Sequence, residues 1–182
     1  MIRTKDILDE KDPRVRAKNS DVEFPLCNEY KNIIPEMLKH LRYSQIEKLS
    51  KKYDLRPGMG LAAPQLGINK NFFVVCYEVK EGVFDDYILI NPKIVSYSEE
   101  MIYAGEGEGC LSVNREVEGI VPRHARITVE AYDMDGKKHK YRVREDLAIA
   151  FQHELDHLNG ILFVDYIDPK DPYKDADIYR EI

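Results

Sequence analysis

The segment QHELDHLNG, residues 152–160, restricts the fold more than any other part of the chain. Residues four apart lie on one face of a helix, so His153 and His157 can direct their rings at a single ion. The five residues before this segment, LAIAF, are all apolar, which predicts that the helix is buried there. We expect a helix from about 145 to 159, ended by Gly160, with its histidines opening into the interior and the rest of the fold packed around it.

Glu154 follows the first histidine directly, which completes the pattern HExxH. It stands beside the histidine face, where a carboxylate accepts a proton from water that a metal activates, without itself binding the ion. This arrangement is typical of zinc hydrolases. A surface helix rich in Glu and His can produce the same pattern by chance, but the apolar residues before it argue against that alternative.

Two histidines leave a catalytic metal site one protein ligand short. Downstream of His157 there is no histidine, and the only glutamate, Glu181, stands next to the C-terminus. Upstream, Cys110 lies in GEGEGCLSV among small, turn-forming residues, where a thiolate would complete a Cys-His-His set with a fourth position open. Cys76, inside the run FFVVCYEV, is expected to be a buried core residue, and Cys27 a loop or core thiol.

The remaining periodicity predicts one further helix and several strands. Apolar residues at helical spacing indicate an amphipathic helix over residues 30–53. Four runs have the composition of strands: residues 71–79, 86–98, 121–133 and 138–144. Pro92 interrupts the second run, and Asp135-Gly136 predicts a hairpin between the last two.

These elements define the predicted fold class, α+β, with mostly antiparallel strands packed around a C-terminal metal-binding helix and with an N-terminal helix. Pro169 and Pro172 break the tail, so no long terminal helix is expected. At 182 residues and 43% hydrophobic content, the chain can fill one core of ordinary size. We therefore expect residues 1–182 to form a single catalytic domain.

Composition restricts the cellular compartment in which the protein is expected and the kinds of partner that it is expected to bind. The net charge is −6, so no overall positive field holds the phosphates of a nucleic acid, and no direct nucleic-acid binding is predicted. No apolar run approaches the roughly 20 residues that cross a bilayer, and the N-terminus is charged rather than apolar. Three scattered cysteines form no disulfide framework, which suits a reducing compartment. We expect a cytoplasmic protein without membrane contact.

The loop GMGLAAPQ, residues 58–65, carries glycines at the spacing of a dinucleotide-binding fingerprint. That interpretation requires a strand before the loop and an uninterrupted helix after it, whereas Pro57 precedes it and Pro64 lies within it. The glycines more plausibly let an extended backbone approach the backbone of a ligand. Gln65 would add an amide that donates a hydrogen bond to a carbonyl oxygen without adding charge.

Three motifs now stand in order: GMGLAAPQ at 58–65, EGCLS at 108–112 and QHELDH at 152–157. Together they closely resemble the peptide deformylases, which remove the formyl group from the N-terminal methionine of new bacterial chains. DPRVR near the N-terminus is similar to a further family element, with Val15 in place of leucine. The segment before the glycine loop and the non-helical tail resemble the longer class typical of Gram-positive bacteria.

The resemblance implies a metal site and a set of catalytic groups. It implies Fe²⁺ as the working ion, with Zn²⁺, Ni²⁺ or Co²⁺ able to substitute. The implied metal ligands are Cys110, His153 and His157, and the implied catalytic groups are Glu154 as general acid and base, with Gln65 and the backbone N–H of Leu111 polarising the formyl oxygen.

It also implies a substrate site. Gly60 would contact the substrate backbone, Ile149 and Ala150 match positions lining the methionine pocket, and Met59, where the family usually has valine or isoleucine, lies at the pocket edge. The expected substrates are N-formyl-methionyl peptides and nascent chains. The protein is expected to be a monomer that comes transiently close to the ribosome. A metalloprotease that cuts internal peptide bonds and a non-catalytic metal-binding protein are the alternatives.

Overall fold

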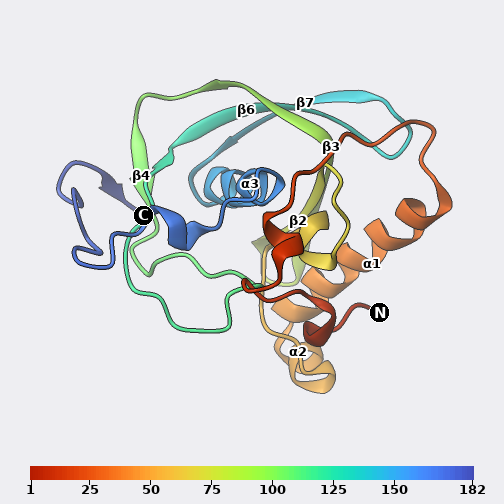
Figure 1. Ribbon diagram of the computed structural model, residues 1–182, viewed down its shortest axis with the longest axis horizontal. Coiled ribbons are helices and arrows are strands. Elements are labelled where there is room, and N and C mark those ends of the chain that lie inside the picture. Colours follow the sequence, from red (N-terminus) through yellow and green to blue (C-terminus); the bar gives the residue numbers. More distant parts are fainter.

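The computed structural model describes residues 1–182, and Figure 1 shows how its helices and strands are arranged. The helices are α1 (Asn28–Gln45), α2 (Glu47–Tyr53) and α3 (Glu145–Leu158), with short 3-10 helices η1 (Thr4–Asp6), η2 (Pro13–Arg16), η3 (Ala63–Leu66) and η4 (Phe163–Tyr166). The strands are β1 (Gly60–Ala62), β2 (Phe72–Lys80), β3 (Val83–Tyr97), β4 (Met101–Tyr103), β5 (Arg123–His124), β6 (Arg126–Tyr132), β7 (Lys138–Arg144) and β8 (Arg180–Glu181).

The strands form two sheets around α3. The larger sheet is antiparallel and has the order β1-β2-β3-β6-β7, and the smaller has the order β5-β4-β8, with β4 and β8 parallel. In Figure 1, α3 lies in the hollow of the curved larger sheet, and α1 lies on the outer side of β2. The predicted α+β class, with antiparallel strands around a C-terminal helix, is confirmed.

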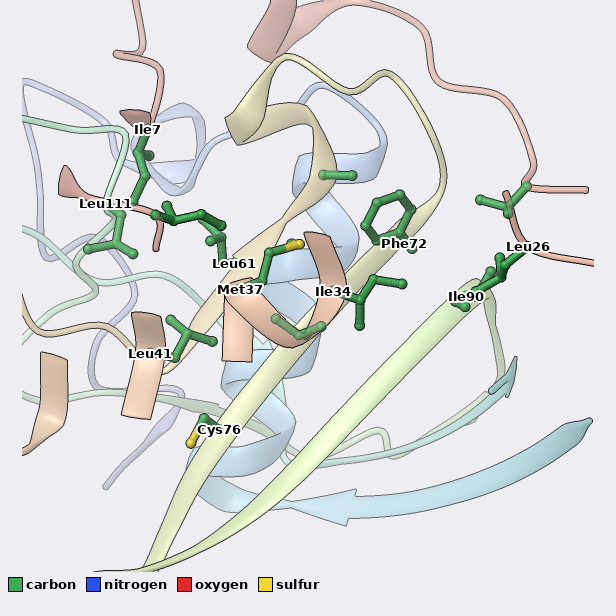
Figure 2. Close-up of a cluster of buried hydrophobic side chains, with 14 residues drawn as sticks. Ile7, Leu26, Ile34, Met37, Leu41, Leu61, Phe72, Cys76, Ile90 and Leu111 are labelled. Atoms are coloured by element: carbon green, nitrogen blue, oxygen red, sulfur yellow. The ribbon is translucent and has the colours of Figure 1, made fainter. Parts of the chain in front are cut away.

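The first five residues of strand β2, Phe72–Cys76, are buried on both faces, which explains their unbroken apolar run. Phe72, Val74 and Cys76 belong to the core cluster that packs against α1, drawn in Figure 2. The alternate residues Phe73 and Val75 belong to a second cluster that packs against α3. Because successive side chains of a strand point to opposite faces, this one strand joins the two cores. Cys76 is fully buried, as predicted.

The prediction of a single helix over residues 30–53 is wrong in one respect. The segment forms two helices, α1 and α2, separated at Ile46, which has an extended backbone. The last residues of α1 contact neighbouring elements instead of continuing the helix. Gln45 donates a 2.9 Å hydrogen bond from Nε2 to the carbonyl of Cys76 on β2, and the hydroxyl of Ser44 accepts one from the N–H of Gly58. Apolar spacing does not reveal such tertiary hydrogen bonds, so it predicted a continuous helix.

Pro92 does not end its strand as expected, because β3 runs through it from Val83 to Tyr97. The register between β3 and β6 shifts between Ile90 and Lys93, so the residue without an N–H lies where the ladder is irregular. The hairpin predicted at Asp135-Gly136 joins β6 to β7.

Strand β7 passes into α3 without an intervening loop. The turn takes place at Glu145, whose φ of +54° is unusual for a residue other than glycine. Its N–H donates to the carbonyl of Ala125, which fixes the start of α3 against the segment between β5 and β6. At the other end, Gly160 follows the helix with φ +71°, the left-handed conformation expected of a residue that ends a helix. No helix is both long and apolar enough to cross a membrane.

Candidate metal centre and active site

Helix α3 and the segment between β4 and β5 bring one cysteine and two histidines together. The ligand atoms of Cys110, His153 and His157 all lie within 4.8 Å of one another. The closest pair is Cys110 Sγ and His157 Nε2, 3.3 Å apart. His157 is 1% exposed and His153 9%, so both histidines lie in the interior, as the apolar residues before them suggested, and Cys110 beside them is half-buried.

A buried acidic group orients His153. Its Nδ1 lies 2.8 Å from Oε1 of Glu108, which leaves Nε2 as the nitrogen able to bind an ion. Arg123 donates to both oxygens of Glu108, at 2.8 and 2.9 Å, and to Asp156 at 2.5 Å. Burial would raise the pKa of Glu108, but the hydrogen bonds from Arg123 and His153 outweigh it and lower this pKa to about 2. Glu108 is therefore an ionised hydrogen-bond acceptor.

Glu154 is 3% exposed, and its Oε2 has no hydrogen-bond partner in the chain. Burial is the main cause that raises the pKa of this carboxyl to about 7. The carboxylate lies against the glycine loop: a Cβ added to Gly60 would lie 2.3 Å from Oε1 of Glu154. Gly60 is thus required by a close approach between the glycine loop and α3.

Two hydrogen-bond donors lie beside the cysteine. The carbonyl oxygen of Gln65 accepts from the N–H of Ala62 at 2.9 Å, which fixes the orientation of its amide. Its Nε2 then donates to Ser112 Oγ at 3.1 Å and lies 3.7 Å from Cys110 Sγ. Leu111 is buried, and its backbone N–H donates no hydrogen bond within the chain. The Leu111 N–H is free to serve an oxygen atom of a bound molecule, and the Gln65 amide can do so in place of its weak contact with Cys110 Sγ.

A pocket of about 520 Å³ opens over these groups. All predicted site residues except His157 line it: Met59, Gly60, Gln65, Cys110, Leu111, Ile149, Ala150, His153 and Glu154. His157 lies behind the lining, where its ring reaches Cys110. Segments that are up to 95 positions apart in sequence, from Met59 to Glu154, therefore meet at one concave site.

Several residues that support this site were not predicted as part of it. Glu108 stands two residues before Cys110, and that spacing is the only signal in the sequence that pointed to it. Arg56 donates a 2.6 Å hydrogen bond from Nη2 to the carbonyl of Cys110, which holds the cysteine segment against the residues before the glycine loop. Arg123 reaches the site from β5, and no local pattern marks such a long-range contact.

If the Glu154 carboxylate acts on a bound molecule, we expect Gly60→Ala to lower kcat/KM by about 100-fold, the typical effect of displacing a reacting group by about 1 Å. The added methyl group would lie 2.3 Å from the Glu154 carboxylate and force it to move. Steady-state kinetics and metal analysis of the purified variant test this, because the metal content should stay unchanged. If the variant had the wild-type kcat/KM, the Glu154 carboxylate would have room to move without loss of activity.

The donor set fits a divalent transition-metal ion. A thiolate and two imidazoles suit zinc and iron, and the pocket leaves one side of the three donors open to a substrate. A buried carboxyl with an unpaired oxygen lies next to them. The fold and the pocket therefore define the class of protein as a metal-dependent hydrolase.

Comparisons with known proteins identify the family within this class. A family model described as polypeptide deformylase matches residues 4–173. A peptide deformylase of Macrococcus caseolyticus is 49% identical over 175 residues, which are 96% of this chain and 95% of that protein. Peptide deformylase 2 of Bacillus anthracis is 45% identical over 177 residues, 97% of this chain and 96% of that protein.

Solved structures agree with the sequence relatives. The crystal structure of a probable peptide deformylase from Synechococcus phage S-SSM7 is 37% identical, with a TM-score of 0.73, and covers 88% of this chain and 98% of that chain. Peptide deformylase from Thermotoga maritima is 33% identical, with a TM-score of 0.70, and covers 90% of this chain and 97% of that chain.

The chain therefore belongs to the polypeptide deformylase family. It is an enzyme, a metal-dependent hydrolase that removes the N-formyl group from the N-terminal methionine of newly synthesised proteins and releases formate. The resemblance inferred from the three motifs is confirmed. The family assignment decides against a protease of internal peptide bonds and against a non-catalytic metal-binding protein.

Proposed function

We propose that Cys110, His153 and His157 hold Fe²⁺, and that Zn²⁺, Ni²⁺ or Co²⁺ can take its place. The observation that carries this proposal is the convergence of the three ligand atoms within 4.8 Å of one another below an open pocket. The ion, when bound, supplies Lewis acidity that brings the pKa of water towards neutrality and polarises the formyl oxygen. Glu108 and Arg123 keep the ring of His153 in the orientation that leaves Nε2 free.

Glu154 is proposed to move the proton. Its buried carboxylate accepts a proton from the attacking water, whose oxygen bonds to the formyl carbon, and then delivers that proton to the leaving nitrogen. The C–N bond breaks to give a free amine and formic acid, which loses its proton to water and leaves as formate. Negative charge develops on the formyl oxygen during the attack. Gln65 Nε2 and the Leu111 N–H donate to it, and each such donor typically lowers the barrier by about 3 kcal/mol.

The pocket walls are proposed to bind the methionyl end of the substrate. Ile149 and Ala150, one turn before His153 on α3, supply an apolar wall for the methionine side chain, with Met59 at the pocket edge. Gly60 lets the substrate backbone approach, because the absence of a side chain leaves its N–H and carbonyl open to the pocket. The substrates are N-formyl-methionyl peptides and nascent chains.

We also propose the domain organisation, the oligomeric state and the cellular location of the enzyme. Residues 1–182 act as a single catalytic domain and as a monomer, and the family match over residues 4–173 supports the first point. We place the enzyme in the cytoplasm, in transient proximity to the ribosome, because its substrate is a new chain. All three cysteines are free thiols, which is compatible with a reducing compartment.

Anaerobic purification, followed by loading with Fe²⁺ or Zn²⁺ in parallel, tests the proposed metal. The measurement is formate release from formyl-Met-Ala-Ser, with acetyl-Met-Ala-Ser as the matched control substrate. We expect rapid formate release from the iron-loaded enzyme, and loss of activity in air because iron and a thiolate ligand both react with oxygen. An iron-loaded enzyme without activity beside an active zinc-loaded enzyme would contradict Fe²⁺ as the working ion.

A further inference from the structure

The last three residues of the chain are bound into the smaller sheet. Strand β8 pairs in parallel with β4, with Arg180 opposite Ile102 and Glu181 opposite Tyr103. Ile182 donates its N–H to the carbonyl of Tyr103 at 3.0 Å, and its own carbonyl accepts the N–H of Gly105 at 3.0 Å. Figure 1 shows the C-terminus beside β4. The terminal backbone therefore has the hydrogen bonds of a regular strand rather than those of a free tail.

The side chains of β8 connect this strand to the start of α3. Arg180 donates to both carboxylate oxygens of Glu145, at 2.8 and 3.0 Å, and to Glu100 at 2.8 Å. Glu145 is the residue with φ +54° at which β7 turns into α3. A bidentate guanidinium–carboxylate pair restricts orientation as well as distance, so it holds this turn in place.

Ile182 belongs to an apolar group that extends to the substrate pocket. It packs, together with Ala104, against the buried cluster of Ile102, Ala125 and Ile149. Two members of this group, Ala104 and Ile149, also line the pocket over the metal-binding residues. The terminal side chain and two residues of the pocket wall therefore belong to one packed apolar group.

We propose that β8 is a positioning element that sets the width of the methionine pocket, through the packing of Ile182 against the cluster that contains Ile149 and through Arg180 at the first residue of α3. This inference rests on the proposed placement of the methionine side chain against Ile149. Protein interiors are packed as densely as organic crystals, so a wall with a void behind it shifts or becomes mobile. A wider or softer wall discriminates less between methionine and bulkier side chains.

The test compares Ile182→Ala with Ile182→Val on formyl-Met-Ala-Ser and formyl-Phe-Ala-Ser. One methylene in an apolar pocket changes kcat/KM by roughly 10-fold or more, so we expect Ile182→Ala to lower the Met/Phe ratio of kcat/KM by about 5-fold. The change should lie in KM, and kcat should stay within about 2-fold of the wild-type value, because the positions of the metal ligands do not depend on the packing of Ile182. Ile182→Val, which retains most of the packing, should restore the wild-type ratio.

Ile178→Ala is the matched control, since Ile178 belongs to the same tail but is 70% exposed. Arg180→Gln is the second variant if Ile182→Ala does not fold, and it should lower the same ratio to a smaller extent. An unchanged Met/Phe ratio together with a lower unfolding temperature would overturn the inference and leave β8 a purely stabilising strand. Failure of the proposed function itself would appear separately, as wild-type enzyme that releases no formate from formyl-Met-Ala-Ser.

Discussion

Glu154→Gln should keep its metal and lose about 1,000-fold in kcat, within the usual range for removal of a general acid–base group. The amide has the shape of the carboxylate but cannot accept the proton of the attacking water. Because Glu154 is 3% exposed and packed against Gly60, bulk water is poorly placed to take over this role. Formate release under saturating substrate gives kcat, and elemental analysis of the same sample gives the metal content.

The control for this variant is Glu106→Gln, the same chemical change at an exposed glutamate in the segment that leads to Cys110. It should have wild-type kcat and metal content. If Glu154→Gln lost its metal in parallel with its activity, the carboxylate would be a ligand or a structural support rather than the group that moves the proton. Unchanged kcat would remove Glu154 from the mechanism.

Cys110→Ala should lower the affinity for the metal by more than about 100-fold, because the loss of a group that only supports a ligand already costs about 10- to 100-fold. The substitution removes the only soft donor of the set and leaves two imidazoles, which are too few to hold an ion in a catalytic site. Metal retained after competition with a chelator is the measurement. Formate release should disappear together with the metal.

Cys27→Ala is the matched cysteine control, because Cys27 is exposed and does not line the pocket. Cys76 is unsuitable, since burial raises the pKa of its thiol to about 12 and its side chain belongs to the core. A Cys110→Ala enzyme with full metal content and activity would show that another residue completes the ligand set.

The histidine pair, the adjacent glutamate and the elements around them followed from local patterns. The helix was predicted over residues 145–159 and found over Glu145–Leu158, and the last strand agrees with Lys138–Arg144. Hydrogen bonding within a helix or hairpin relates residues only a few positions apart, so spacing alone indicates which of them share a face. Cys110 was identified by the chemistry of its side chain and its glycine-rich surroundings, because no spacing rule connects it to α3.

The supporting contacts could not be inferred in the same way. The Glu108–Arg123 pair and the packing of Ile182 against the cluster that contains Ile149 each join segments whose separation in sequence says nothing about their distance in space. The break at Ile46 likewise arises where Gln45 bonds to the backbone of β2. Residue type and local spacing thus indicated the candidate metal ligands and the helix that presents two of them. Tertiary packing alone decided how the ligands are oriented and what stands behind the pocket wall, because those contacts form only when distant segments fold together.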